Sequence, residues 1–175
     1  MTALLIIDTE TTGLDPDRAR LLEIGAVLLV DGAIKDTLRI PIIAELDGAD
    51  PKALEINRYH DRAAAGEWRD AIPEAMAVRV IGMAARLATP AYWTAFDGVM
   101  LGAAATRAGI DRQSTMWSRG LDLASMAALV RGRDRLCSLV RALEMFKLDP
   151  IPDTHRHTAL GDAHGAARVA IAMGY

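Results

Sequence analysis

The chain has 175 residues, of which 51% are hydrophobic and 25% are charged, and its formal net charge at pH 7 is −3. This length fits a single domain over residues 1–175, and the hydrophobic content excludes a disordered chain. The single cysteine excludes an intramolecular disulfide and a cysteine-rich zinc site, and the negative net charge excludes a protein that binds duplex nucleic acid through bulk positive charge.

The N-terminal third of the chain predicts strands. An apolar run at residues 3–7 predicts a short buried strand and is far shorter than the ~20 residues of a membrane span. A second apolar run at 21–30 predicts the next strand. Asp31-Gly32 is a strong hairpin signal, so a third strand over 33–40 is expected to pair antiparallel with the second.

The rest of the chain predicts helices with one further strand. Pro51 and Pro73 suit the first turn of a helix, and apolar residues recur at helical spacing after Pro73. This order predicts an α/β domain whose mixed, partly antiparallel sheet is flanked by α-helices. The expected strand covers 91–96, and the expected helices cover 51–56, 73–88, 99–108, 121–130, 136–146 and 159–173.

A pair of carboxylates follows the first predicted strand. Asp8 and Glu10 are two residues apart, and side chains with that spacing in a strand point to the same face. Two adjacent carboxylates repel each other unless a divalent cation lies between them, so the pair indicates a metal site. An isolated Asp-x-Glu, however, is more often a strand that ends in a polar turn.

Two later segments place acidic residues at predicted helix starts. Asp97 precedes the helix at 99–108, where an aspartate alone is most often an N-cap. His157 and Asp162 are five residues apart, so we place His157 in the loop before the last helix and Asp162 inside that helix. The helix dipole alone also favours an aspartate in a first turn, so neither segment is specific by itself.

Taken together, these segments resemble a known family. The order Asp8-x-Glu10, Asp97 and His157-x-Ala-x-x-Asp162 is similar to the DEDD exonuclease superfamily, and most closely to its DEDDh branch, which includes DNA polymerase III proofreading subunits and RNase T. The resemblance spans nearly the whole chain, and its third motif matches at every defining position.

The resemblance implies an RNase H-like fold and a 3′–5′ exonuclease that acts on single-stranded DNA or RNA and releases nucleoside 5′-monophosphates. The carboxylates Asp8, Glu10, Asp97 and Asp162 would bind two divalent cations, Mg²⁺ or Mn²⁺, which agrees with hard oxygen ligands and no cysteine. One cation would activate water and the other would stabilise the departing 3′ oxygen. His157 would be the general base, because histidine titrates near neutral pH.

The resemblance also implies contacts to the terminal nucleotide. The backbone of Thr11, Thr12 and Gly13 would hold this nucleotide, and the side chain of Leu14 would wedge against its base. The middle motif departs from the family, which has His-Asn-Ala or similar where this chain has Tyr-Trp-Thr-Ala before Phe96. We expect Trp93 in this segment to contact the substrate.

The resemblance further implies where the protein acts and with what. Its expected partners are nucleic acid 3′ ends, and no association with a membrane is expected. A polymerase partner follows from the likeness to proofreading subunits, although no extra tail indicates one, and the sequence does not predict the oligomeric state. We expect a cytoplasmic protein of a bacterium or of a phage-infected cell, because one free cysteine suits a reducing compartment.

Two alternatives stay open at this stage. A catalytically silent relative would be a nucleic-acid-binding module of a replication complex, although the full set of carboxylates and the histidine argues against a decayed site. A zinc hydrolase would use His155, His157 and His164 with Asp162, since histidines and a carboxylate form an acceptable zinc set. That alternative leaves the other carboxylates unexplained.

Three charged residues outside the motifs receive structural interpretations. Glu23 lies in the middle of a predicted strand and is expected to be a hydrogen-bond acceptor rather than a metal ligand. Arg58 and Arg62 are four residues apart and would share one helix face, and a solvated face is favoured over contacts to a phosphate backbone.

Overall fold

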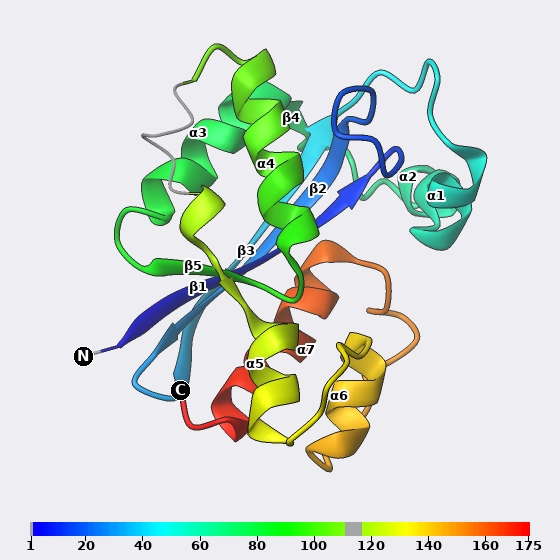
Figure 1. The fold of residues 1–175 in the computed structure, drawn as a ribbon. Coiled ribbons are helices and arrows are strands. Elements are labelled where there is room, and N and C mark those ends of the chain that lie inside the picture. The colour runs from blue at the N-terminus through cyan, green and yellow to red at the C-terminus, as the bar shows by residue number, and fades with distance from the viewer. Residues whose placement is uncertain (1, 111–116) are drawn as a thin grey trace.

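The computed structural model describes residues 2–110 and 117–175, and Figure 1 shows the arrangement of their helices and strands. The strands are β1 (Ala3–Thr11), β2 (Leu21–Val30), β3 (Ala33–Ile43), β4 (Ile72–Pro73), β5 (Thr89–Tyr92) and β6 (Leu121–Asp122). They form a six-stranded sheet in the order β4-β3-β2-β1-β5-β6. β1 pairs antiparallel with β2 and parallel with β5, so the predicted mixed sheet is confirmed.

The helices are α1 (Pro51–Ile56), α2 (Tyr59–Ala64), α3 (Glu74–Ala84), α4 (Ala95–Arg107), α5 (Leu123–Val130), α6 (Leu139–Met145) and α7 (Ala159–Ala172). A short 3₁₀ turn covers Trp117–Arg119. Each predicted helix has a counterpart, and α2 is a helix that the sequence did not predict. Among the described residues, no helix is both long and apolar enough to cross a membrane.

Several boundaries differ from the sequence prediction for physical reasons. The first strand continues through Thr11 rather than ending at Ile7, because its polar residues still pair with β2. Thr89-Pro90 does not merely stop a helix but begins β5, which pairs with Leu4 and Leu5. The helix expected from residue 121 begins at Leu123, because Asp122 accepts a hydrogen bond from the backbone N–H of Ser125 and caps it.

Helices cover both faces of the sheet (Figure 1). On one face, α3 and α4 bury residues such as Ile81 and Met100 against Ile7. On the other face, α5, α6 and α7 pack against Leu4 and Ile6. Alternate residues of β1 therefore face opposite layers, as the period of a strand requires. The layer that contains α7 is the one toward which Asp8 and Glu10 point.

Candidate active site

Asp8 and Glu10 lie on the central strand of the sheet. Both are within β1 rather than after it, and they pair with Gly25 and Glu23 of β2. Because they are two residues apart in one strand, both carboxylates project from the face that α7 covers. The two side chains therefore point in the same direction, as their spacing in the strand predicted.

The start of α7 brings a third carboxylate to this place. Thr158 caps the helix by accepting a hydrogen bond from the backbone N–H of Gly161 at 3.1 Å, and Asp162 lies in the first turn. Gly25 permits this approach, because a Cβ there would overlap the backbone of Ala159. As a result, carboxylate oxygens of Asp8, Glu10 and Asp162 lie within 4.8 Å of one another.

Asp97 reaches the same end of β1 from the opposite layer. It lies in the first turn of α4, is 5% exposed, and does not act as the N-cap, which is Thr94. Its Oδ1 accepts hydrogen bonds from the backbone N–H of Thr9 at 2.9 Å and from Thr9 Oγ1 at 2.7 Å. Since Thr9 stands between the two β1 carboxylates in sequence, these bonds fix Asp97 beside them.

The carboxylates raise one another's pKa values. Burial, followed by the charges of Asp97 and Glu10, raises the pKa of Asp8 well above its ordinary value. Burial and the charge of Asp162 raise the pKa of Glu10 to about 8. Burial raises the pKa of Asp97 to about 7, although its hydrogen bonds from Thr9 act in the opposite direction. Carboxyl groups held together against this repulsion form the arrangement that a divalent cation would stabilise.

These shifts predict an unusual pH dependence of stability for the metal-free protein. In the folded protein, Glu10 keeps its proton up to its pKa of about 8 and Asp97 up to its pKa of about 7. In the unfolded chain both groups titrate near their ordinary values. The unfolded state therefore loses protons first, so the free energy of unfolding should fall as the pH rises from about 5 to 8. Melting in EDTA across this range tests the sign. A melting temperature that rises toward pH 8 would contradict the shifts, and Glu10→Gln should flatten the profile.

His157 lies in the loop immediately before α7, as the sequence predicted. It is exposed and has a left-handed backbone with φ of 54°. Burial raises the pKa of Asp162, and the charge and backbone N–H of His157 partly oppose that effect, which places His157 next to the carboxylate. Arg58 holds this loop by donating hydrogen bonds to the carbonyls of Thr154 and Arg156 at 3.2 and 3.3 Å.

The segment expected to hold the terminal nucleotide lies at the end of β1. Leu14 is 77% exposed and lines a hollow of about 220 Å³ together with Thr12 and Gly13. The side chain of Thr11 donates to the carbonyl of Gly13 at 2.7 Å. The backbone N–H of Thr12 already donates to the carbonyl of Arg20 at 2.9 Å, so this group is not free for a nucleotide in the structure.

Trp93 is more buried than its neighbours in the sequence suggest. Its side chain is 8% exposed and belongs to the core between the sheet and α5, α6 and α7. The indole N–H donates to the carbonyl of Cys137 at 3.2 Å. A buried indole whose polar atom is already bonded has a packing role, and contact of Trp93 with a substrate stays a prediction.

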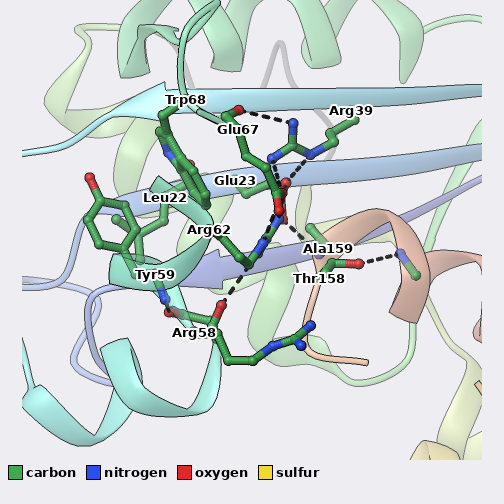
Figure 2. A network of polar contacts seen from close by, with 12 residues as sticks. Leu22, Glu23, Arg39, Arg58, Tyr59, Arg62, Glu67, Trp68, Thr158 and Ala159 are labelled. Carbon is green, nitrogen blue, oxygen red and sulfur yellow. Dashed lines mark hydrogen bonds and ion pairs between the residues drawn. The ribbon is translucent and has the colours of Figure 1, made fainter. Parts of the chain in front are cut away.

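A buried ion-pair network surrounds Glu23 (Figure 2), which pairs with Glu10 across β1 and β2. Glu23 is 0% exposed and accepts hydrogen bonds from Arg62 at 2.8 and 3.0 Å, from Arg39, and from the backbone N–H of Ala159 at 3.0 Å. Glu67 also pairs with both arginines. Glu23 is thus a structural acceptor, as predicted, and it ties the first residue of α7 to β2.

Arg62 corrects the prediction of a solvated face. It is 5% exposed, its guanidinium stacks on Trp68 at 4.9 Å, and it bonds Glu23 beside the start of α7 (Figure 2). A signal for this was available in the sequence: Glu23 stands in the middle of an apolar strand, and a buried carboxylate needs a cationic partner. The spacing of charges within α2 alone did not reveal that partner.

The donor set fits a hard divalent cation better than zinc. Across residues 2–110 and 117–175, the group of His, Cys, Asp or Glu side chains that brings ligand atoms together contains Asp8, Glu10 and Asp162, and no histidine. His155 and His164 are exposed on the loop and on α7. Carboxylate oxygens suit Mg²⁺ or Mn²⁺, whereas the histidine-based zinc site is not assembled.

Comparisons with known proteins agree with this geometry. A family model described as Exonuclease, that of RNase T, matches residues 5–170. No curated protein sequence matches the chain significantly. A structure of exonuclease I, described for how it achieves processivity, is similar with a TM-score of 0.77 at 16% identity, over 98% of this chain and 40% of that chain.

Two further structures of E. coli exonuclease I give the same picture. A complex with a dT13 oligonucleotide has a TM-score of 0.74 at 17% identity, over 98% of this chain and 40% of that one. A zinc-bound complex with single-stranded DNA has a TM-score of 0.75 at 17% identity, with the same coverage. The likeness shows the RNase H-like fold, and this chain spans about 40% of the length of these structures.

Proposed function

The chain belongs to the exonuclease family whose model is that of RNase T, within the DEDD superfamily of 3′–5′ exonucleases, and on this basis we propose that it removes nucleotides singly from the 3′ ends of single-stranded DNA or RNA. The products would be nucleoside 5′-monophosphates. The partners would be nucleic acid 3′ ends, in line with the single-stranded DNA complexes described for E. coli exonuclease I.

The observation that carries this proposal is the convergence of carboxylates from three elements. Asp8 and Glu10 come from β1, Asp97 from α4 and Asp162 from α7. Elements so far apart in sequence have no packing reason to bury acidic groups together, and the raised pKa values show that the arrangement opposes the ordinary ionisation of these groups.

The carboxylates would hold two divalent cations, Mg²⁺ or Mn²⁺, which supply positive charge at the scissile phosphate and at the water and leaving oxygens. The protein's own contribution is to keep these oxygens close together: Thr9 fixes Asp97, and Gly25 allows α7 to bring Asp162 to β1. Leu14, exposed beside its hollow, would contact the terminal base, and the backbone of residues 11–13 would lie along the terminal nucleotide.

His157 would accept the proton of the attacking water on an imidazole nitrogen. The new bond joins the water oxygen to phosphorus, and the bond from phosphorus to the 3′ oxygen breaks. This oxygen would take a proton from solvent and become the 3′-hydroxyl of the shortened strand. The exposed position of His157 beside Asp162 allows the proton to pass on to solvent.

His157→Ala is expected to lower turnover by roughly 10²–10⁴-fold, because general base catalysis contributes about that factor. Neither the affinity for the metal nor that for the substrate should change comparably, since His157 is not among the clustered carboxylates. Single-turnover cleavage, compared with metal binding by calorimetry, separates these effects. His155→Ala is the matched control in the same loop, and unchanged turnover in His157→Ala would remove this residue from the role of base.

Labelled oligonucleotides test the activity itself. Single-stranded DNA and RNA, labelled at either end, would be incubated with Mg²⁺, Mn²⁺ or EDTA. Stepwise shortening from the 3′ end that EDTA abolishes is the expected result. Binding of oligonucleotides without cleavage under any of these conditions would contradict the enzyme and favour the silent binding module.

A further inference from the structure

A cavity of about 610 Å³ lies beside α7, outside the cluster of carboxylates. Neither Asp162 nor His157 lines it; its walls come from β3, α2, α7 and the loop before α7. Cavities that bind small ligands have volumes of roughly 300–1,000 Å³, so this space can hold a group as large as a nucleotide.

The side chains around this cavity are mainly cationic or neutral donors. Arg39, Arg62 and Arg168 line it, and Glu67 is the acidic residue among the lining residues that the structure describes. Arg39 and Arg62 are engaged by Glu23 and Glu67, as Figure 2 shows. These two arginines and two glutamates balance one another, so the charge left over is that of Arg168.

Arg168 is only partly committed within the protein. One of its terminal nitrogens donates to the backbone carbonyl of Asp149 at 2.6 Å. Within the described parts of the chain it forms no ion pair with a carboxylate. A half-buried guanidinium without a counter-ion, aligned by a carbonyl, is well suited to a phosphate. His164, one turn earlier on α7, places its imidazole at the same cavity.

The remaining wall is apolar. Ile151, Pro152 and Leu160 line the cavity together with Gly161 and Gly165 of α7. A cavity lined by both apolar side chains and a cationic group suits a nucleotide, whose base or sugar packs on hydrocarbon while its phosphate contacts the charge. A bare inorganic anion would make no contact with these apolar side chains.

The cavity adjoins the catalytic loop. His155 lines it, and Thr158 Oγ1 donates to the carbonyl of His155 at 2.8 Å at the start of α7. Arg168 follows Asp162 by about 9 Å of helix rise. We propose that this cavity binds an internal nucleotide of the strand whose 3′ end lies at the carboxylates, with Arg168 contacting its phosphate. This assignment rests on the proposed exonuclease function.

The test is binding of 5′-labelled single-stranded oligodeoxythymidylates of increasing length, measured by anisotropy with Ca²⁺ in place of Mg²⁺ to slow turnover. Arg168→Gln is expected to weaken binding of the longer oligonucleotides roughly tenfold. It should also reduce the slope of log K against log salt by about 0.7, the value for one phosphate contact on a single strand. The shortest oligonucleotides, which end before the cavity, should bind both proteins equally.

Matched variants isolate the contact. Arg79→Gln replaces an exposed arginine of α3, on the opposite face of the sheet, and should bind like the wild type. Arg168→Lys keeps the charge and should restore the salt slope. His164→Gln, at an exposed position, gives a second variant should Arg168→Gln fail to fold, and is expected to weaken the longer oligonucleotides only.

The other outcomes overturn the assignment in distinguishable ways. Normal binding of long oligonucleotides by Arg168→Gln overturns the cavity alone, as does an equal loss at every length. A third outcome would assign the cavity to a free nucleotide instead. In that case the affinity shows no step with oligonucleotide length, and free thymidine monophosphate displaces long oligonucleotides from the wild type but not from Arg168→Gln. A wild type that binds no oligonucleotide overturns the proposed function and the cavity together.

Discussion

Replacing Asp8 or Asp162 by asparagine should abolish 3′-end cleavage while raising the melting temperature of the metal-free protein. Each residue contributes a carboxylate to the cluster, and loss of an oxygen charge that holds a cation removes several kcal/mol of transition-state stabilisation. The expected loss of turnover is roughly 10³-fold or more. The two effects have opposite signs, which a residue needed only for folding would not produce.

The stability effect follows from repulsion among the carboxyl groups. Glu10, Asp97 and Asp162 each raise the pKa of Asp8, so removal of one charge relieves the others. A gain of 1 kcal/mol would raise the melting temperature by about 2–4 °C in a protein of this size. Melting in EDTA at about pH 8 shows the effect best, because the repulsion is largest where the groups are driven to ionise.

Added Mg²⁺ should make the wild type more stable than the asparagine variants, which reverses the order of melting temperatures expected without metal. The wild type is expected to gain stability on addition of the metal by mass action, whereas Asp8→Asn should gain much less. Asp134→Asn, at an exposed position between α5 and α6, is the matched control and should change neither cleavage nor melting. A large drop in the melting temperature of Asp8→Asn without metal would show that the carboxylate is structural and would defeat the interpretation of the cluster.

Local periodicity in the sequence predicts the direction of individual side chains of this site. The two-residue period of a strand places Asp8 and Glu10 on one face, and Asp162 was placed at the start of the last helix. The convergence of these segments is a tertiary fact. Resemblance to a family implied it, whereas spacing within each segment did not.

Arg62 and Trp93 are both more buried than their neighbours in the sequence suggest, for a common physical reason. Arg62 was expected in solvent because its neighbours in sequence are polar, but its partner Glu23 stands 39 residues earlier. Trp93 was expected at the substrate because it is close to a motif, but β5 leads it into the core, where Cys137 accepts its N–H. In both cases a long-range hydrogen bond decides the burial of a polar group, and no periodicity within a segment encodes such a bond.

The same long-range network leads to the second large effect, which is on stability. Glu23→Gln is expected to lower the free energy of unfolding by about 3 kcal/mol, because Arg62, itself 5% exposed, loses the charge of its buried partner. The glutamine amide oxygen can still accept the N–H of Ala159, so the start of α7 keeps its hydrogen bond. The stability of Glu23→Gln therefore reports the loss of the charge of Glu23, because glutamine keeps the shape of the side chain.

Urea unfolding followed by tryptophan fluorescence suits this test, since Arg39 and Arg62 stack on Trp68 at 5.6 and 4.9 Å. Glu67→Gln is the matched control: it pairs with the same arginines, but its side chain is 39% exposed, so its removal should cost less than about 1 kcal/mol. Equal losses in the two variants would mean that burial of Glu23 does not govern the network.

A double variant separates the charge from the packing. Replacing Arg62 by methionine in the Glu23→Gln background removes the buried cation, whose remaining anionic partner is the half-exposed Glu67, while keeping its hydrocarbon stem, and it should recover part of the lost stability. Because the charge of Glu23 raises the pKa values of Asp8 and Glu10, its loss in Glu23→Gln should lower both, so the fall in stability of the metal-free protein with rising pH should be smaller and end at a lower pH. Failure of the double variant to recover any stability would show that the loss in Glu23→Gln does not come from the buried charge of Arg62.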